Sequence, residues 1–203
     1  TRALINDFPE DYKWYKQKWL VFNGIKQPNR NRLLWRDPHV DGLKTGHTKG
    51  AGYCLVSSAL QNNMRLIAVV MGAPSDAGRN NDSQAILNWG FRFYKTYKLF
   101  DGKTAVSNPR TWLGKNKYTP MGLNKPLYVT IPVGQEKGLK ASVSLNPSLK
   151  APIKKGQQYG AINVTLYGKQ LKNVPLVALR DDPKGGLWTR TTDHVAKFFK
   201  SWF

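Results

Sequence analysis

The chain has 203 residues, 40% of them apolar, and its 32 Lys and Arg against 12 Asp and Glu give a net charge of +20. That length accommodates one large domain or two small ones. The charge predicts attraction to an anionic partner such as nucleic acid, anionic lipid or an acidic polymer, without choosing among them. The single cysteine, Cys54, excludes a disulfide framework and a thiolate zinc site, and we expect neither metal nor cofactor. No run reaches the roughly 18 apolar residues of a membrane span.

Residues 1–100 combine helix and strand patterns. The opening "TRALINDFPEDYKWYKQ" starts inside an apparent helix, so we expect a fragment or a processed product cut within a domain. Two apolar runs, "GYCLVSSAL" and "MRLIAVVMGA", are separated by residues 61–63 and predict a β-hairpin. The next stretch, "SDAGRNNDSQAILNWGFRFYKTY", predicts a helix packed on these strands, with Ile86, Trp89, Phe93 and Tyr97 at helical spacing. Together they predict part of an α/β layer.

Residues 101–183 change character and predict a small antiparallel β domain. Short apolar runs rich in Thr, Val and Tyr alternate with Gly and Pro, as in "LYVTIPVG", "KASVSL", "QQYGAINVTLYGK" and "VPLVALRDD". The alternation of apolar and polar residues is regular in "YVTIPV" and "ASVSL", as expected of strands with one buried face.

Residues 184–203 predict a C-terminal helix with one apolar face. Pro183 and the pair Gly185-Gly186 separate it from the β domain. Two interpretations stay open, a helix docked on the protein's own core and an amphipathic helix lying in an anionic membrane surface. Trp suits the headgroup boundary of a bilayer, which favours the second. The residues expected on the apolar face are Trp188, Val195, Phe198, Phe199 and Trp202.

The stretch "DGLKTGHTKGAGY", residues 41–53, is unusual for a strand because it contains four glycines. Glycine in a strand often marks close approach of a ligand or of another backbone. If Lys44, Thr45 and Gly46 lie on an edge strand beside a cleft, a peptide can add as a further strand. Lys44 and Thr45 then face its anionic end, and a backbone N–H after Gly46 can stabilise an oxyanion. The alternative interpretation is a solvated turn in a basic protein.

In acyl-transfer enzymes that react with penicillin, K-T-G accompanies S-x-x-K and S-D-N. No Ser in this chain is followed three places later by Lys. The only S-x-N, residues 144–146, follows K-T-G and lies in the β zone, so we interpret it as coincidence.

A longer stretch, "NGIKQPNRNRLLWRDPHVDGLKTGHTKGAGYCLVSSALQNNMRLIAVVMGAPSDAGR", followed by "ILNWGFRFY", resembles the low-molecular-mass penicillin-binding proteins. These are the serine-type D-alanyl-D-alanine carboxypeptidases of bacterial cell walls, and the similarity is to the penicillin-binding protein 5 group. It continues through "LYVTIPVG", "LKAS", "APIKKGQQYG" and "PLVAL" to "FFKSWF", and so covers essentially the whole chain.

The resemblance implies an α+β protein with three parts. Residues 1–100 would be the C-terminal part of a penicillin-recognising α/β domain, residues 101–183 a small antiparallel β domain, and residues 184–203 an amphipathic membrane anchor. It implies a location in the periplasm, peripheral on the inner membrane. The first part lacks much of its domain, so we expect it to fold poorly without the missing segment.

The resemblance also implies roles for individual residues. Lys44, Thr45 and Gly46 match the third family motif, and the backbone N–H of His47 matches the oxyanion-hole position. Arg30 in "NRN" and Arg79 in "AGR" match arginines near the substrate's terminal carboxylate, which Arg can bind in a bidentate manner. For both arginines a purely structural role is the alternative.

The function implied is removal of the terminal D-Ala from peptidoglycan stem peptides through a serine acyl-enzyme, with acylation by β-lactams. Because the nucleophile and base are missing, we expect this chain alone to be inactive and the parent protein to be active. One alternative is a non-catalytic, membrane-bound spacer or interaction module. A basic nucleic-acid-binding module is a further alternative, but the basic residues are spread along the chain and no nucleic-acid motif is present, so we expect no nucleic-acid partner.

Overall fold

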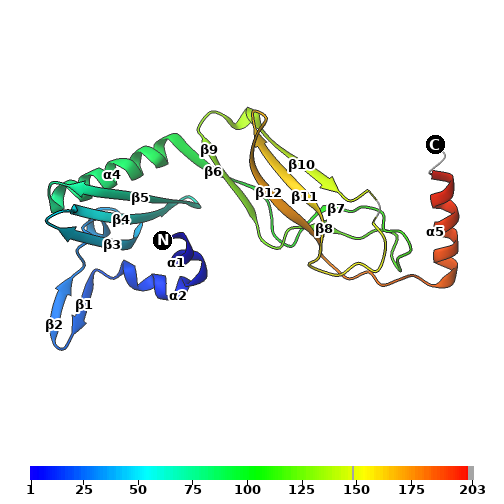
Figure 1. Ribbon diagram of the computed structural model, residues 1–203, viewed down its shortest axis with the longest axis horizontal. Coiled ribbons are helices and arrows are strands. Elements are labelled where there is room, and N and C mark those ends of the chain that lie inside the picture. The colour runs from blue at the N-terminus through cyan, green and yellow to red at the C-terminus, as the bar shows by residue number, and fades with distance from the viewer. Residues whose placement is uncertain (148, 201–203) are drawn as a thin grey trace. The chain divides into compact units, whose positions relative to one another are not determined.

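The computed structural model describes residues 1–147 and 149–200, with side chains placed through residue 193. The chain divides into two compact units, Thr1–Thr96 and Tyr97–Phe203 (Figure 1). The domain boundaries at residues 100 and 183 stay predictions.

Unit 1 begins with short helical segments and an exposed hairpin. The hairpin turns at Asn23-Gly24, where both residues have positive φ, as the tightest antiparallel turns require. The elements before the main sheet are α1 (Arg2–Asp7), α2 (Pro9–Tyr12), the 3-10 turn η1 (Lys13–Lys16), β1 (Trp19–Phe22), β2 (Ile25–Pro28) and α3 (Leu33–Arg36).

The main sheet of unit 1 is antiparallel, has the order β3-β4-β5, and packs against helix α4 (Figure 1). Its strands are β3 (Val40–Thr48), β4 (Gly52–Gln61) and β5 (Met64–Ala73), and α4 spans Asp76–Phe93. Asn62 and Asn63 form the turn between β4 and β5 with positive φ. The predicted hairpin and the helix after it are therefore confirmed.

The face that α4 turns to the sheet differs from the predicted one. Ile86, Trp89 and Phe93 are 47%, 55% and 46% exposed, and Tyr97 lies beyond the helix in a strand. The buried residues of α4 are small or polar apart from Leu87, and a Cβ at Gly90 would lie 2.5 Å from a methyl group of Leu66. The helix approaches the sheet closely through these small residues, which leaves its largest apolar side chains outside.

Unit 2 is built mainly from antiparallel strands. β6 (Tyr94–Phe100) pairs with β9 (Leu127–Pro132), and a second sheet has the order β10-β11-β12-β8-β7. The elements of the second sheet are β7 (Ala105–Ser107), β8 (Met121–Gly122), β10 (Leu139–Leu145), β11 (Gln158–Leu166) and β12 (Lys169–Ala178), with the 3-10 turn η2 (Glu136–Gly138) before β10. Alternate residues of β9 are buried, as its sequence pattern predicts. Ile162, Val164 and Leu176 are fully buried in the core of this unit.

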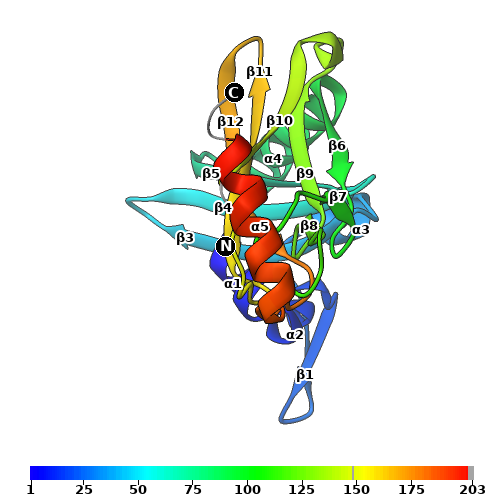
Figure 2. The same ribbon diagram turned by 90° about the vertical axis from the view of Figure 1, so that its right-hand side faces the viewer.

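Helix α5 (Leu187–Lys200) follows the β strands, at the end of the sheet where β11 begins and β12 finishes (Figures 1 and 2). The α+β class, the antiparallel β part and the short C-terminal helix are confirmed. Across residues 1–147 and 149–200, none of the helices has both the length and the apolar character that crossing a bilayer requires.

Candidate functional site: the edge of strand β3

Lys44, Thr45 and Gly46 lie on β3, at an edge of the main sheet of unit 1. They pair with residues 54–56 of β4, and in the described part of the chain no strand pairs with the other side of β3. A strand edge offers backbone N–H and C=O groups to a further strand. The position is therefore suited to an extended peptide.

The glycines of this stretch differ in whether the surrounding structure leaves room for a side chain. At Gly42 a Cβ would lie 2.6 Å from the hydroxyl of Tyr12, and Gly52 has a φ of +64° and lies against the backbone of β5. At Gly46 a Cβ would meet only the Cβ of Cys54, at an ordinary 3.9 Å, and its φ is not positive. The fold thus requires glycine at 42 and 52 but leaves open space beside Gly46.

A groove of about 430 Å³ lies beside this strand. Lys44 and Thr45 line one side of it, and Arg30 lines it from the loop after β2. Trp14 and Trp19, which are 67% and 48% exposed, add an aromatic wall. The structure therefore brings Arg30 to the same groove as Lys44 and Thr45, although Lys44 is 14 positions further along the chain.

The groove carries two cationic side chains that have no carboxylate partner among the residues that the structure describes. Lys44 Nζ donates to the carbonyl of Thr45 at 2.6 Å, and neither Lys44 nor Arg30 forms an ion pair within the described residues. Two cations without an ion-pair partner, beside a hydroxyl group, are suited to receive a carboxylate.

Two asparagines fix the loop that carries Arg30. Asn29 donates to the carbonyl of Gln17 at 3.0 Å and accepts from the backbone N–H of Asn31. Asn31 is fully buried and donates to the carbonyl of Gly42 on β3 at 2.9 Å. The "NRN" stretch thus ties the arginine to the strand that carries K-T-G.

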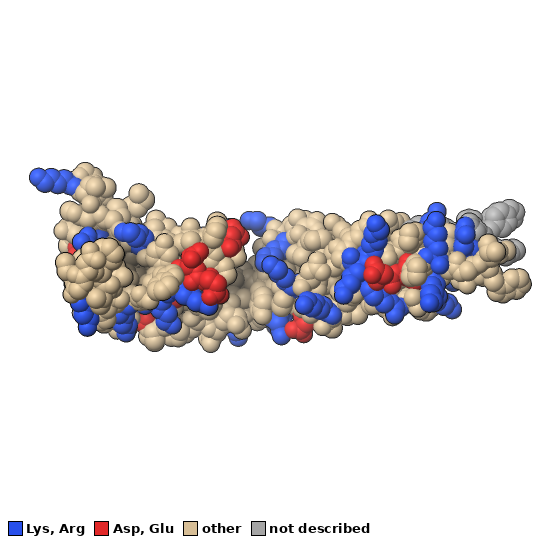
Figure 3. Space-filling view, turned by 90° about the horizontal axis from the view of Figure 1, so that it is seen from below, with Lys and Arg blue, Asp and Glu red and all other residues tan. Residues whose placement is uncertain are grey.

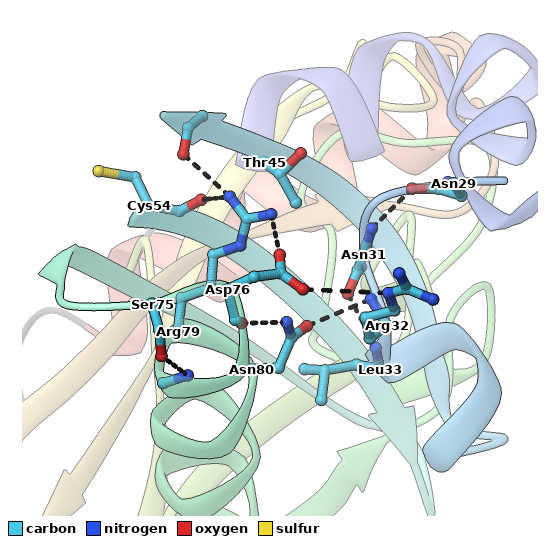
Figure 4. Close-up of polar contacts among 12 residues, drawn as sticks. Asn29, Asn31, Arg32, Leu33, Thr45, Cys54, Ser75, Asp76, Arg79 and Asn80 are labelled. Atoms are coloured by element: carbon cyan, nitrogen blue, oxygen red, sulfur yellow. Dashed lines mark hydrogen bonds and ion pairs between the residues drawn. The ribbon is translucent and has the colours of Figure 1, made fainter. Parts of the chain in front are cut away.

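The first turns of α4 support both sides of the groove (Figure 4). The helix begins at the N-cap Ser75, whose hydroxyl accepts from the N–H of Gly78. Asn80, fully buried, accepts from the backbone N–H of Arg32 next to the arginine loop. Arg79 donates to the carbonyl of Gly46 at 3.0 Å and to that of Cys54 at 3.3 Å.

Arg79 is not among the residues that line the groove. Its side chain is 5% exposed, pairs with Asp76, and lies 5.4 Å from the ring centre of Tyr53. In this structure it holds β3 and β4 to the helix at the position of Gly46. Its contact with a substrate carboxylate stays a prediction.

A buried polar group supports the start of β3. Tyr12 donates to Asp41 at 2.8 Å, and Arg65 donates to the same oxygen at 2.8 Å. Burial and the bond to Asp41 raise the pKa of Tyr12 to about 12, despite a hydrogen bond with Ser58 that lowers it. Tyr12 thus stays neutral and packs against Gly42.

The remaining predicted residues are not among those that line the groove. His47 is exposed, with its ring 4.0 Å from that of Tyr53, and only its backbone N–H was assigned a role. Trp188 in the first turn of α5 is 84% exposed. The other anchor residues fall outside the described residues: the side chains of Val195, Phe198 and Phe199, and Trp202 altogether.

Sequence reasoning missed three supports of the groove, Asn31, Asn80 and Tyr12. The asparagines flanking Arg30 were a usable signal, because paired Asn side chains commonly bond to nearby backbone. Asn80 and Tyr12 bond to residues 48 and 29 positions away, and no local pattern marks such contacts.

Known proteins resemble the chain along its length. A family model described as D-alanyl-D-alanine carboxypeptidase matches residues 1–75, and one described as penicillin-binding protein 5, C-terminal domain, matches residues 94–184. The D-alanyl-D-alanine carboxypeptidases DacC and DacA of Escherichia coli K12 are 47% and 46% identical, each over 100% of this chain and 51% of its own length.

A solved structure agrees with these matches. The crystal structure of penicillin binding protein 5 from Haemophilus influenzae has a TM-score of 0.78 at 42% identity, over 90% of this chain and 54% of that one. The chain spans about half the length of the curated relatives it matches. As its sequence predicts, the chain belongs to the D-alanyl-D-alanine carboxypeptidase family of low-molecular-mass penicillin-binding proteins.

Proposed function

We propose that the groove beside β3 binds the C-terminal carboxylate of a peptidoglycan stem peptide that ends in D-Ala-D-Ala. The observation that carries the proposal is that Lys44 and Arg30, which form no ion pair within the described residues, line the groove together with Thr45, next to the open space at Gly46. The peptide adds as a strand along the unpaired edge of β3, held by backbone hydrogen bonds.

The reaction belongs to the complete protein, at the length of its relatives. There a serine Oγ forms an ester with the carbonyl of the penultimate D-Ala while the amide bond to the terminal D-Ala breaks, and water then hydrolyses the ester. The S-x-x-K serine and lysine are not among the 203 residues. This chain supplies carboxylate recognition and, through the backbone N–H of His47, a donor to the developing oxyanion.

β-Lactams acylate the same serine in this proposal, so fluorescent penicillin is a direct assay. We expect the complete protein to be labelled and the 203-residue chain to remain unlabelled. A covalent penicillin adduct on the 203-residue chain, seen by intact mass, would contradict the assignment of the nucleophile to residues outside it.

α5 attaches the protein to the periplasmic surface of the inner membrane in this proposal. Leu187 and Trp188 in its first turn are 82% and 84% exposed, as expected of side chains available to a bilayer. Sedimentation with anionic vesicles tests the anchor, because deletion of residues 187–203 from the complete protein should abolish binding. Unchanged sedimentation of the deleted protein would exclude α5 as the anchor.

A further inference from the structure

The positive charge of the chain is concentrated in unit 2. Residues 97–203 carry 18 Lys and Arg but five Asp and Glu, and hence +13 of the total +20. Much of that charge gathers over one end of the unit, where α5 leaves it (Figure 3). A surface with this sign and density attracts an anionic partner.

Three loops are joined at that end of the unit. Trp112 pairs with Lys150, Gly114 with Lys184, and Ile153 with Asp182 in isolated bridges. Buried Asp182 also accepts from the backbone and side-chain N–H groups of Asn116, at 3.0 and 2.9 Å. Residues 110–118, 149–155 and 180–186 thus form one continuous surface, here called the end face.

The end face presents exposed lysines that the fold does not use. None of them forms a salt bridge within the described residues, and Asp181, Asp182 and Asp193 make other contacts. Asp182 is buried, Asp193 pairs with Arg110, and Asp181 accepts from the backbone N–H of Lys155. The end-face lysines are Lys115, Lys117, Lys150, Lys154, Lys155 and Lys184.

α5 is held against this surface by a specific contact. Asp193 accepts from Arg110 at 2.8 Å and from the backbone N–H of Leu113 at 2.7 Å. The guanidinium of Arg110 in turn stacks 4.0 Å from the ring centre of Trp112. The exposed Leu187 therefore starts a helix that is fixed beside the end-face lysines.

We propose that the end-face lysines form a second membrane contact that binds the phosphate headgroups of anionic lipids while α5 lies in the bilayer surface. The inference rests on the proposed attachment through α5, which brings the end face to within a Debye length of the headgroups. Lipid is favoured over a soluble anionic polymer because apolar side chains and unpaired cations lie together here. The two contacts together fix the orientation of unit 2 on the membrane, which a single helix would not do.

Matched variants of the complete protein test the proposal. One carries Lys115→Gln, Lys117→Gln and Lys150→Gln on the end face. The control carries Lys137→Gln, Lys140→Gln and Lys169→Gln at the opposite end of the β10–β11–β12 sheet, where Lys140 and Lys169 pair with Thr165 and Leu166. Both variants lose three charges from exposed positions that form no salt bridge within the described residues.

Sedimentation is measured with phosphatidylcholine vesicles with and without phosphatidylglycerol. Each lysine near an anionic surface strengthens binding about 5-fold, so we expect the end-face variant to bind anionic vesicles on the order of 10- to 100-fold more weakly. The control should stay within about 2-fold of wild type, since its charges lie beyond the screening distance. Vesicles without phosphatidylglycerol should not distinguish the two variants.

Equal losses of vesicle binding in the two variants, or no loss in either, would overturn the proposal. It would also be overturned if the end-face variant bound purified cell-wall polymer more weakly but bound vesicles normally. Deleting residues 187–203 distinguishes the proposed α5 anchor from the proposed end-face contact. If the deletion abolishes binding while the end-face variant binds normally, the anchor stands and the end-face contact is wrong. If the deleted protein binds normally and the end-face lysines are still needed, the lysine contact stands without the anchor.

Discussion

Replacing Gly46 by Ala tests why a glycine occupies the groove-side strand. A Cβ at this position meets only the Cβ of Cys54, at 3.9 Å, and the backbone φ is not positive. The fold therefore tolerates the methyl group, and Ala in a strand is favoured over Gly by roughly 0.5–1 kcal/mol. We expect the unfolding free energy of the complete protein to stay unchanged or rise by about that amount.

The same methyl group should damage function. In the proposed binding mode, it would take up space that a peptide strand or a β-lactam needs beside β3 and would shift the ligand away from the oxyanion donor. Loss of one such preorganised interaction costs on the order of 100-fold in rate. We therefore expect acylation by fluorescent penicillin to slow on the order of 100-fold while thermal unfolding is preserved.

Two neighbouring glycines provide the controls. Gly50→Ala also places a Cβ in open space, but Gly50 lies in the turn between β3 and β4, whereas Gly46 directly follows the groove residue Thr45 on β3. Both stability and acylation should therefore be retained in Gly50→Ala. Gly42→Ala would place a Cβ 2.6 Å from the Tyr12 hydroxyl, so it should lower the melting temperature. Acylation of Gly46→Ala within about twofold of wild type would refute the argument that the space beside Gly46 is kept for a ligand.

Three further predictions concern the groove and its supports. Lys44→Ala and Thr45→Ala should each slow turnover on the order of 100-fold with unchanged thermal unfolding; turnover within twofold for both would mean that the site is misplaced. Arg79→Ala should lower the unfolding free energy by about 3 kcal/mol in denaturant titrations, because it removes the donor to two strand carbonyls and leaves Asp76 with only a 3.9 Å contact to Arg32; a loss below 1 kcal/mol would contradict this role. Because the pKa of Tyr12 is raised to about 12, its neutral form stabilises the fold fully below pH 10, and that contribution is lost as the pH rises through 12. The ultraviolet titration of wild type minus that of Tyr12→Phe gives the ionisation of Tyr12, which we expect near pH 12. Ionisation near pH 10 would show that Tyr12 is not buried as described.

Much of the fold follows from local patterns in the sequence. The alternation in "LYVTIPVG" and the paired apolar runs before residue 74 predict strands that the structure contains, because burial of one face imposes a period of two. The packed face of α4 was predicted wrongly from the spacing of Ile86, Trp89 and Phe93. Close approach through Gly90 selects the face that packs, and it depends on the position of Leu66 on strand β5.

The candidate site is less accessible to sequence reasoning. The K-T-G motif and its neighbours predict which residues carry charge, but not which glycines the fold itself requires. Gly42 is fixed by Tyr12, 30 positions earlier, whereas Gly46 is not fixed by any such contact. Likewise, the bonds from Arg79 to two strand carbonyls arise from the register of β3 and β4, which only the assembled sheet determines.

The most direct test of carboxylate recognition compares two peptide substrates of the complete protein, one ending in D-Ala-D-Ala with a free carboxylate and the other with the same end amidated. The groove charges Lys44 and Arg30 should make wild type prefer the free carboxylate, with a kcat/KM on the order of 100-fold higher. The variant Arg30→Ala should lose at least about tenfold of that preference while its melting temperature is unchanged. A preference for the free carboxylate that persists undiminished in Arg30→Ala and in Lys44→Ala would contradict the assignment of the groove.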